Sequence, residues 1–398
     1  PTGGERLLGF YIHVPFCHGK CPYCDVSSRP DSPRKMDAYV SAVTAALAPW
    51  RERLAGRELA TVYFGGGTPS LLGARRLGTI LQAVRQGFSL APGAEITLEA
   101  NPTSVDRAFF QEVRQAGFNR LSMGLQSANE EELRFLGRAH SPQQAAQAVE
   151  NARAAGFSNI SLDLMLGLPG GSREKLGRSI AFAASLGVEH ISSYILKVEP
   201  GTPFAARGVQ VPDEDDTAEQ YLFAVEELAR RLDSLDVDAL LAVLAKEQPQ
   251  LHLLSAAGEQ ALEKKAAEKA ARHNLLYWRG EEYLGFGPGA HSFFGGRRFY
   301  YSRDLEGFLQ GNSPVDDGPG GDFGEYAMLN LRLTRGLRRG DCLTRFGAEG
   351  GALFDEVLEN ARRCPPRLLR ADGEAISFTP EGFLVSNALL VRLLGEEL

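Results

Sequence analysis

The sequence predicts an α/β protein built on a parallel sheet, either open or closed into a barrel. Short apolar runs alternate with amphipathic helical stretches from about residue 8 to residue 230, and several polar motifs directly follow the apolar runs. Catalytic groups of such folds gather at the carboxyl ends of the strands, so these motifs are expected to share one edge. The six β–α units fall short of a full eight-fold barrel.

The predicted strands are short and apolar, and a stretch with helical periodicity follows most of them. The strands are expected at residues 7–14, 60–64, 95–99, 120–124, 159–165 and 190–196. The helices between them are expected at residues 36–55, 74–86, 108–116, 142–155 and 172–186.

The second half of the chain departs from this pattern. Residues 232–272 are rich in Ala, Leu, Glu and Lys, which favours a helical connector over a binding element. Aromatic and glycine-rich segments follow, and then a linker at residues 311–322. A strand at 375–378 and a helix at 386–394 fit a small α+β, winged-helix-like end. The predicted domains are therefore residues 1–231, 232–272 and 273–398.

Composition indicates a soluble globular protein. The 398 residues are 43% hydrophobic and 23% charged, and the net charge of −7 argues against a broad nucleic-acid-binding surface. No apolar run approaches the roughly 18 residues of a membrane span, and the N-terminus lacks a signal-like pattern. Three of the five cysteines are clustered, which fits a reducing compartment. We expect a cytoplasmic protein that is not a membrane protein and that is a monomer or a homodimer.

Cys17, Cys21 and Cys24 lie together in the run HVPFCHGKCPYC. A [4Fe–4S] cluster held wholly by protein needs four thiolates, so three leave one iron open to an outside ligand. A molecule with an amino and a carboxylate group, such as S-adenosylmethionine, can chelate that iron, and a low-potential cluster can pass it an electron. A Cys3His zinc site that uses His13 or His18 is the alternative, although no second cysteine pair appears later. The odd number of cysteines disfavours a disulfide.

The run FGGGTPS at residues 64–70 follows the second predicted strand. Adjacent glycines let the backbone approach a ligand closely, and the expected ligand is the amino group of a methionine moiety, held by glycine carbonyls. A tight turn between strand and helix explains the same glycines without a ligand.

Four more polar residues lie on or after predicted strands. Glu99 and Asp163 are candidates for binding ribose hydroxyls or an ammonium group. Gln126 is a candidate hydrogen-bonding partner of the ligand, and Arg138 can pair with a carboxylate. Each residue alone is more often structural, so the prediction depends on their convergence at one sheet edge.

These motifs carry a resemblance to a known family. The patterns HxPFCxxxCxYC, GGGTPS, ExNP, NRLSMGLQS, LGRAH and DLMLGLPG resemble the radical S-adenosylmethionine proteins of the coproporphyrinogen dehydrogenase group, and most closely the HemW-type heme chaperones. The resemblance runs from about residue 8 to 204 and resumes at residue 273. It implies a partial (β/α)6, TIM-like barrel with a C-terminal domain and a [4Fe–4S] cluster on the three cysteines. The S-adenosylmethionine contacts that it implies are Tyr11, Tyr23, Gly66, Gly67, Thr68, Glu99, Gln126, Arg138 and Asp163, with Ile195 a weaker contact near the adenine.

Two features favour the chaperone branch over the porphyrinogen-oxidising enzymes. Those enzymes carry a long N-terminal extension and an extra cysteine two residues after the triad, whereas here about ten residues precede the cysteine segment and Asp25 and Val26 follow Cys24. The run from His273 to Trp278, HNLLYW, matches the HNxxYW motif that the chaperones use for heme. An imidazole can ligate heme iron, and aromatic rings can stack on a porphyrin.

Alternatives remain at this motif. On the six residues alone, a surface histidine capped by Asn274 beside two core aromatics is the favoured explanation of HNLLYW, and the family context reverses that preference. His291, in GPGAHSF, is either a polar group at the barrel mouth or a structural histidine. The strand that normally leads to HNxxYW in the family reads here as LHLLSAA at 251–257, without the usual polar residues, and His252 is a weak substitute ligand.

The sequence thus predicts a protein that binds a [4Fe–4S] cluster, S-adenosylmethionine and heme, and that delivers heme to an acceptor such as a membrane-bound respiratory protein. The main alternative is an oxygen-independent coproporphyrinogen III oxidase, in which a deoxyadenosyl radical drives oxidative decarboxylation. Radical methyl transfer and a zinc-stabilised binding module are further alternatives. The sequence assigns no catalytic side chain.

Overall fold

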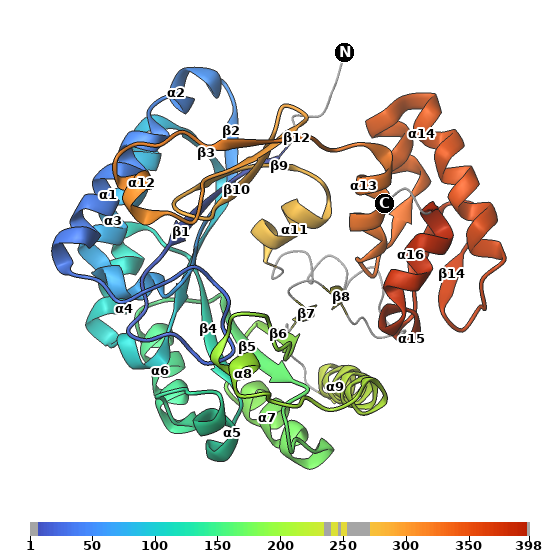
Figure 1. Cartoon of the computed structure of the whole chain (residues 1–398), viewed down its shortest axis with the longest axis horizontal. Helices are drawn as coiled ribbons and strands as arrows, with labels where there is room; N and C mark the ends of the chain where they lie inside the picture. Colours follow the sequence, from blue (N-terminus) through green and yellow to red (C-terminus); the bar gives the residue numbers. More distant parts are fainter. Residues whose placement is uncertain (1–6, 235–239, 246–247, 253–270, 396–398) are drawn as a thin grey trace.

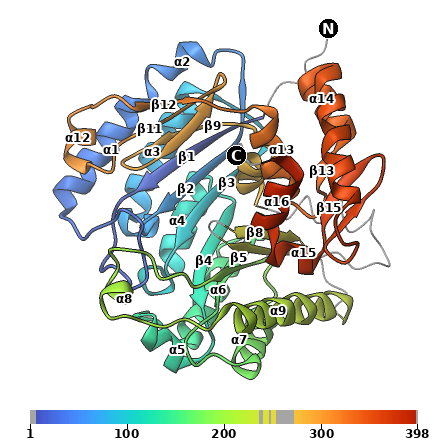
Figure 2. The same ribbon diagram turned by 45° about the vertical axis from the view of Figure 1, so that its right-hand side comes forward.

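The computed structural model describes residues 7–234, 240–245, 248–252 and 271–395. A curved sheet carries most helices on its outer face, and the C-terminal region lies beside the open side of the curve (Figure 1). A short helix, α11 (Arg272–Trp278), lies inside the curve between the sheet and the C-terminal region. The view in Figure 2 agrees with this arrangement.

The predicted parallel sheet is confirmed, and each of its first six strands pairs in parallel with the next. The strands are β1 (Leu8–Val14), β2 (Glu58–Gly66), β3 (Ser89–Ala100), β4 (Arg120–Gln126), β5 (Ile160–Leu166) and β6 (His190–Ile195). The helices on the outer face are α1 (Pro33–Leu47), α3 (Gly73–Gly87), α4 (Arg107–Ala116), α6 (Pro142–Ala154) and α7 (Arg173–Ser185).

The first predicted helix, at residues 36–55, is too long. Helix α1 stops at Leu47, and a separate short helix, α2 (Trp50–Arg53), begins after Pro49. Proline has no backbone N–H to donate into the preceding turn, so it separates the two helices. Other short elements that were not predicted are η1 (Pro69–Leu72), η2 (Pro102–Ser104), α5 (Glu130–Phe135), α8 (Pro203–Ala206) and the longer α9 (Glu214–Ser234).

The two faces of the sheet differ in chemistry because side chains alternate along each strand. On β1, Phe10, Ile12 and Val14 are fully buried in the hydrophobic core that the outer helices cover. Tyr11 and His13 alternate with them and therefore belong to the inner face. Parallel register extends this inner, mostly polar face across the sheet to Tyr63, Thr97, Glu99, Arg120, Ser122, Asp163 and Ser192.

The sheet continues beyond the six predicted strands at both ends. Strand β7 (Leu240–Ala245) lies parallel to β6, and β8 (Gln248–His252) returns antiparallel to it. The prediction of a helical connector is therefore wrong for these two segments, because the uninterrupted apolar run LLAVLA suits a strand of a parallel sheet. Residues 253–270, which hold most of the run of helix formers, lie outside the described residues.

At the other end, β9 (Glu282–Phe286) pairs in parallel with β1. The antiparallel strands β10 (His291–Phe294), β11 (Arg297–Tyr300) and β12 (Val315–Pro319) follow outward. The segment at 311–322, predicted as a linker, thus contributes an edge strand, a position that tolerates the proline at its end. Helix α12 (Leu305–Leu309) connects β11 to β12.

The C-terminal region is a small α+β unit with an antiparallel sheet in the strand order β13-β15-β14. The predicted strand is present as β15 (Ala375–Phe378) and the predicted helix as α16 (Ser386–Leu394). The remaining elements are α13 (Phe323–Leu331), β13 (Leu337–Arg338), α14 (Arg339–Arg362), β14 (Leu369–Ala371) and α15 (Pro380–Leu384). Among the residues that the structure describes, no helix has the length and apolarity needed to cross a membrane.

Candidate functional site

The three clustered cysteines lie on one closed loop at the carboxyl end of β1. The Cys17 N–H donates to the Arg29 carbonyl at 3.1 Å, and the Arg29 N–H donates to the Pro15 carbonyl at 3.0 Å, which closes the loop at its base. Within it, the Cys24 N–H donates to the Cys21 carbonyl at 3.0 Å. In the described part of the chain none of the three cysteines is in a disulfide, and all three are partly exposed. The loop therefore offers three accessible sulfur ligands from one short segment.

His13, a candidate fourth ligand of the zinc alternative, is buried beneath this loop. Its Nδ1 lies 3.1 Å from the Tyr11 hydroxyl oxygen and its Nε2 lies 3.3 Å from the Ser27 carbonyl oxygen. Both ring nitrogens thus have protein partners, and the contact with Ser27 joins β1 to the cysteine loop. Across the described ranges, no group of three or more His, Cys, Asp or Glu side chains has the geometry to hold a single metal ion.

The glycine run is packed directly against the cysteine loop. The Gly67 N–H donates to the Val14 carbonyl at 2.8 Å, and the Thr68 N–H donates to the Phe16 carbonyl at 2.7 Å. A Cβ on Gly67 would lie 2.6 Å from the Phe16 carbonyl oxygen, and Gly66 has a positive φ of 109°. Glycine is required here because two backbones meet. The Thr68 hydroxyl oxygen also lies 3.4 Å from the Cys17 sulfur, so the two motifs form one structure.

Glu99 connects the glycine run to the inner face of the sheet. The Tyr63 hydroxyl donates to Glu99 Oε1 at 2.7 Å, and the Gly66 N–H donates to Glu99 Oε2 at 3.1 Å. The carboxylate therefore lies next to the glycine run. This position suits recognition of an ammonium group or hydroxyls.

Gln126, at the end of β4, is strained and incompletely satisfied. Its φ of 67° is the one positive φ of a non-glycine residue in the part of the chain that the structure describes. Its Oε1 is buried without a hydrogen-bond partner. The backbone conformation costs about 1–3 kcal/mol, and an unsatisfied buried amide oxygen costs a similar amount. Strain combined with an orphaned acceptor indicates a site for a ligand that donates a hydrogen bond.

Arg138 reaches the same place from the loop after α5. It donates from Nη2 to the Gly124 carbonyl at 2.9 Å and from Nη1 to the Cys21 sulfur at 3.7 Å, while its buried Nε has no partner. Burial opposes its charge, but Tyr23 and Cys21 raise the pKa of Arg138 above its ordinary value. A Cβ on Gly124 would lie 2.7 Å from Arg138 Nη2 and 2.8 Å from Gln126 Nε2. Gln126 and Arg138 therefore converge over one glycine.

Asp163 lies on the inner face of β5. Burial, and then the charge of Glu99, raises the pKa of Asp163 to about 7. The Ser122 hydroxyl donates to its Oδ1 at 3.4 Å. At the end of β6, Ile195 packs beside Gly167, where an added Cβ would lie 3.3 Å from the Ile195 Cγ2. Strands β4 and β5 thus supply polar groups to this region, and the end of β6 supplies an apolar one.

Tyr11 and Tyr23 are the remaining predicted contacts, and they lie at different depths in the barrel. Tyr23, inside the cysteine loop, lies beside Arg138, and burial raises its pKa well above the ordinary value. Tyr11 lies deeper, with its ring 6.1 Å from that of Tyr63 and 6.2 Å from that of His273. The structure therefore brings the predicted cluster and S-adenosylmethionine residues to one end of the barrel, with Tyr11 beneath them.

His273 lies at the opposite end of the barrel and is 1% exposed. Its Nδ1 lies 2.7 Å from Thr61 Oγ1 and its Nε2 lies 2.7 Å from the Tyr277 hydroxyl oxygen. Its N–H donates to Glu95 Oε1 at 3.1 Å. Burial, followed by the charge of Arg120, lowers the pKa of His273 to about 3, so the ring is neutral. In this conformation both ring nitrogens have protein partners.

His291 is exposed and stacks on Tyr300 with ring centres 5.1 Å apart, outside the inner face.

Sequence reasoning missed Tyr63 and Arg120. Tyr63 orients Glu99, and Arg120 balances the charge of the buried Glu95. Arg120 Nε lies 4.0 Å from Glu95 Oε2. Strand alternation was the available signal, because Tyr63 falls on the same face as Tyr11 once β1 and β2 are aligned.

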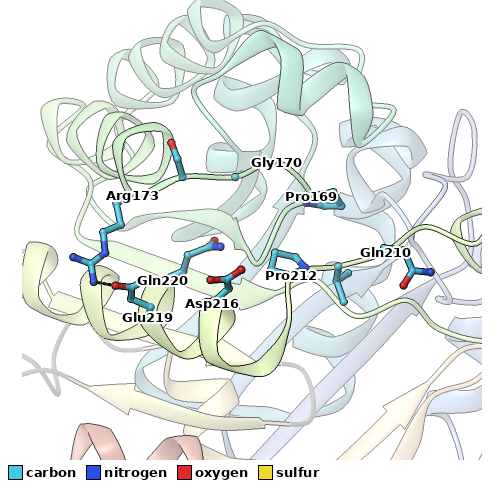
Figure 3. Close-up of a pocket in the computed structure, with 11 residues that line it drawn as sticks. Pro169, Gly170, Arg173, Gln210, Pro212, Asp216, Glu219 and Gln220 are labelled. Atoms are coloured by element: carbon cyan, nitrogen blue, oxygen red, sulfur yellow. Dashed lines mark hydrogen bonds and ion pairs between the residues drawn. The ribbon is translucent and has the colours of Figure 1, made fainter.

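A separate pocket of about 410 Å³ lies between the loop after β5 and the start of α9 (Figure 3). The Arg173–Glu219 ion pair borders it, and Asp216 and Gln220 also line it. None of the predicted site residues lines this pocket. It is therefore distinct from the predicted site at the carboxyl ends of the strands.

The fold and the cysteine site define a radical S-adenosylmethionine protein. The model of the radical SAM superfamily matches residues 11–183. The chain is 36% identical to the heme chaperone HemW of Mycobacterium tuberculosis H37Rv, covering 99% of this chain and 96% of that protein. It is 39% identical to the Escherichia coli K12 heme chaperone HemW, covering 76% of each chain. The chain belongs to the HemW family of the radical SAM superfamily.

A solved structure shows the same fold. Coproporphyrinogen III oxidase (HemN) from Escherichia coli matches with a TM-score of 0.77, covering 98% of this chain and 90% of that one. The sequences are 22% identical, so this likeness establishes architecture alone.

Proposed function

We propose that this protein is a heme chaperone that binds one [4Fe–4S] cluster, S-adenosylmethionine and heme, and hands the heme to an acceptor protein. The observation that carries the proposal is similarity over nearly the whole chain to proteins named heme chaperone HemW, at 30–36% identity in Bacillus subtilis and Mycobacterium tuberculosis. The acceptor in this proposal is a membrane-bound respiratory protein. The short contacts between the cysteine and glycine loops support the cofactor part.

Cys17, Cys21 and Cys24 would hold the cluster. Three partly exposed thiols on one closed loop suit a cluster that keeps an iron open for S-adenosylmethionine. When bound, the cluster supplies a single electron at low potential. Arg138 would lie beside the bound cluster, because its Nη1 is 3.7 Å from the Cys21 sulfur.

S-adenosylmethionine would lie across the ends of β2 to β6. Its carboxylate suits Arg138, whose Nε lacks a partner, and its hydroxyl or ammonium donors suit the orphaned Gln126 Oε1. Glu99 and Asp163 supply further acceptors, and Ile195 offers an apolar contact for the adenine. Gly66, Gly67 and Thr68 line the approach to the cysteine loop, with Tyr11 and Tyr23 as aromatic support.

The heme contact at His273 stays part of the proposal. A neutral imidazole is the form that ligates iron, and a pKa of about 3 keeps this ring neutral. Ligation through Nε2 requires the Tyr277 hydroxyl to give up its 2.7 Å contact. We therefore propose that heme meets His273 only when α11 changes conformation.

An anaerobic titration of hemin into reconstituted protein, with and without S-adenosylmethionine, tests the function. We expect saturable heme binding with the cluster spectrum intact. His273→Ala is expected to weaken heme binding without loss of iron–sulfur absorbance. In parallel, the protein is incubated with coproporphyrinogen III and S-adenosylmethionine. Sustained formation of protoporphyrinogen would contradict the chaperone proposal and favour the oxidase.

A further inference from the structure

The strained turn at Gln126 is built on the Leu125 carbonyl. The register of β4 against β5 passes from Gly124 to Gln126 and skips Leu125. The Ser127 N–H then folds back to the Leu125 carbonyl at 2.9 Å, across the positive φ of 67° at Gln126. A hydrogen bond between residues i and i+2 around a positive φ defines the rare and strained form of the γ-turn. Such a turn persists only where surrounding contacts fix it.

His140 supplies such a contact from the connection between α5 and α6. Its Nε2 lies 3.0 Å from the Leu125 carbonyl oxygen, and the side chain is 4% exposed. A carbonyl oxygen only accepts hydrogen bonds, so Nε2 carries the proton and donates. Among the residues that the structure describes, the buried Nδ1 has no partner, and burial lowers the pKa of His140 to about 4. The ring is therefore neutral near pH 7, and its one N–H bonds the turn.

The same short connection holds two consecutive carbonyls at the end of β4. Arg138 donates from Nη2 to the Gly124 carbonyl at 2.9 Å, and His140 donates to the next carbonyl, that of Leu125. The connection is fixed at both of its own ends. The Arg138 N–H donates back into α5 at 2.9 Å, and Ser141, directly after His140, begins the capping box of α6. The turn is thus held by a segment that two helices keep in place.

The position of the Gln126 amide depends on this turn. Gln126 Oε1 is buried without a hydrogen-bond partner in the described ranges. A Cβ on Gly124 would lie 2.8 Å from Gln126 Nε2 and 2.7 Å from Arg138 Nη2, so the two side chains converge. Without the His140 N–H, Gln126 can relax to the negative φ that non-glycine residues prefer. That change would rotate the amide away from Arg138.

We propose that His140 is a positioning residue for S-adenosylmethionine, because it holds the turn that keeps Gln126 Oε1 open to a hydrogen-bond donor of the ligand. This inference rests on the cofactor part of the proposed function and deepens it. His140 acts through Gln126 and does not itself contact the ligand.

The test is calorimetric titration of S-adenosylmethionine into full-length, cluster-loaded protein, kept anaerobic with no added reductant. His140→Leu keeps a side chain of similar size but removes the donor, and is expected to weaken binding about tenfold. His140→Gln is the matched control, because its amide N–H reaches the position of the imidazole Nε2. It is expected to stay within about threefold of wild type. Iron–sulfur absorbance and thermal unfolding are recorded for each variant.

A second measurement asks whether His140 acts through Gln126. Gln126→Leu removes the acceptor itself, and His140→Leu is then introduced into that variant. We expect no further loss of affinity, because two residues that act as one unit are not additive. A general loosening of the fold would weaken binding by the same factor in both backgrounds.

Wild-type affinity in His140→Leu overturns the inference, and so does equal weakening in His140→Leu and His140→Gln. Equal further weakening in the Gln126→Leu background also overturns it. If His140→Leu does not retain the cluster, His140→Asn replaces it, because its shorter amide does not reach the position of Nε2, and wild-type affinity there is contradictory. If the wild-type protein binds no S-adenosylmethionine, the cofactor part of the proposed function fails, and this inference fails with it.

Discussion

The two ends of the barrel are built in opposite ways. At the carboxyl ends of the strands, Gln126 Oε1 and Arg138 Nε are buried without partners, and Gln126 has a strained backbone. At the base, His273 has a partner at Nδ1, at Nε2 and at its backbone N–H. The difference teaches that Gln126 and Arg138 keep polar atoms open to a ligand, whereas His273 can meet a ligand only after one of its protein contacts is broken.

The largest effect is expected at the cysteine loop. Cys21→Ser removes one of three thiolates and leaves too few ligands for the cluster, so iron and iron–sulfur absorbance should be lost almost completely after anaerobic reconstitution. Cys364→Ser is the matched control, because that cysteine lies in the C-terminal region and donates to the Asn360 carbonyl. A full complement of iron in Cys21→Ser would show that the cysteine loop does not hold the cluster.

The second prediction concerns His273, at the base of the barrel, and the dependence of the unfolding free energy on pH. The folded pKa of His273 is about 3 and the ordinary value is 6.5, so the folded protein resists protonation. The resulting stability is fully present above pH 6.5 and is lost as pH falls toward 3, by up to a few kcal/mol. His273→Gln should flatten this part of the curve of unfolding free energy against pH, measured by urea denaturation of protein without cofactors. An unchanged curve would show that His273 is not held neutral in the fold.

Adding one methyl group at the contact between the glycine and cysteine loops should destabilise the protein. Gly67→Ala places a Cβ 2.6 Å from the Phe16 carbonyl oxygen, a backbone atom, and should destabilise the protein by about 1–3 kcal/mol. Gly78→Ala is the control, since its Cβ would meet Ala116 at an ordinary 3.6 Å within α3 and should stabilise by about 0.5–1 kcal/mol. Thermal unfolding measures both. Equal melting temperatures for the two variants would contradict the packing described here.

The smallest effect concerns Asp163, whose pKa is raised to about 7 by burial and by Glu99. If its carboxylate accepts hydrogen bonds from S-adenosylmethionine, affinity should increase by about a few fold as pH rises through 7, because the ligand favours the charged form. Asp163→Asn should remove this dependence in calorimetric titrations of reconstituted protein. A parallel pH dependence in the variant would assign the titration to another group.

Local patterns in the sequence predicted much of the fold and of the open end. Six strands were predicted because each is an apolar run of the right length, and the cysteine spacing indicated three ligands directly. Strands β7 and β12 were missed, because β7 lies in a segment rich in helix formers and the composition of β12, VDDGP, is that of a loop. Tertiary pairing determines such strands more than local preference does.

The HNLLYW motif shows more clearly which contacts the sequence could not predict. HNLLYW matches the motif that the family resemblance links to heme, yet no local pattern states that Thr61 and Tyr277 engage both nitrogens of His273. These contacts depend on how α11 enters the barrel.

The most direct test of the account is an anaerobic hemin titration of the cluster-loaded, full-length protein, followed by absorbance in the heme and iron–sulfur bands. The account predicts saturable binding of a single heme with the cluster retained, and no conversion of coproporphyrinogen III when S-adenosylmethionine is added. Failure to bind heme, or sustained turnover of coproporphyrinogen III, would contradict it.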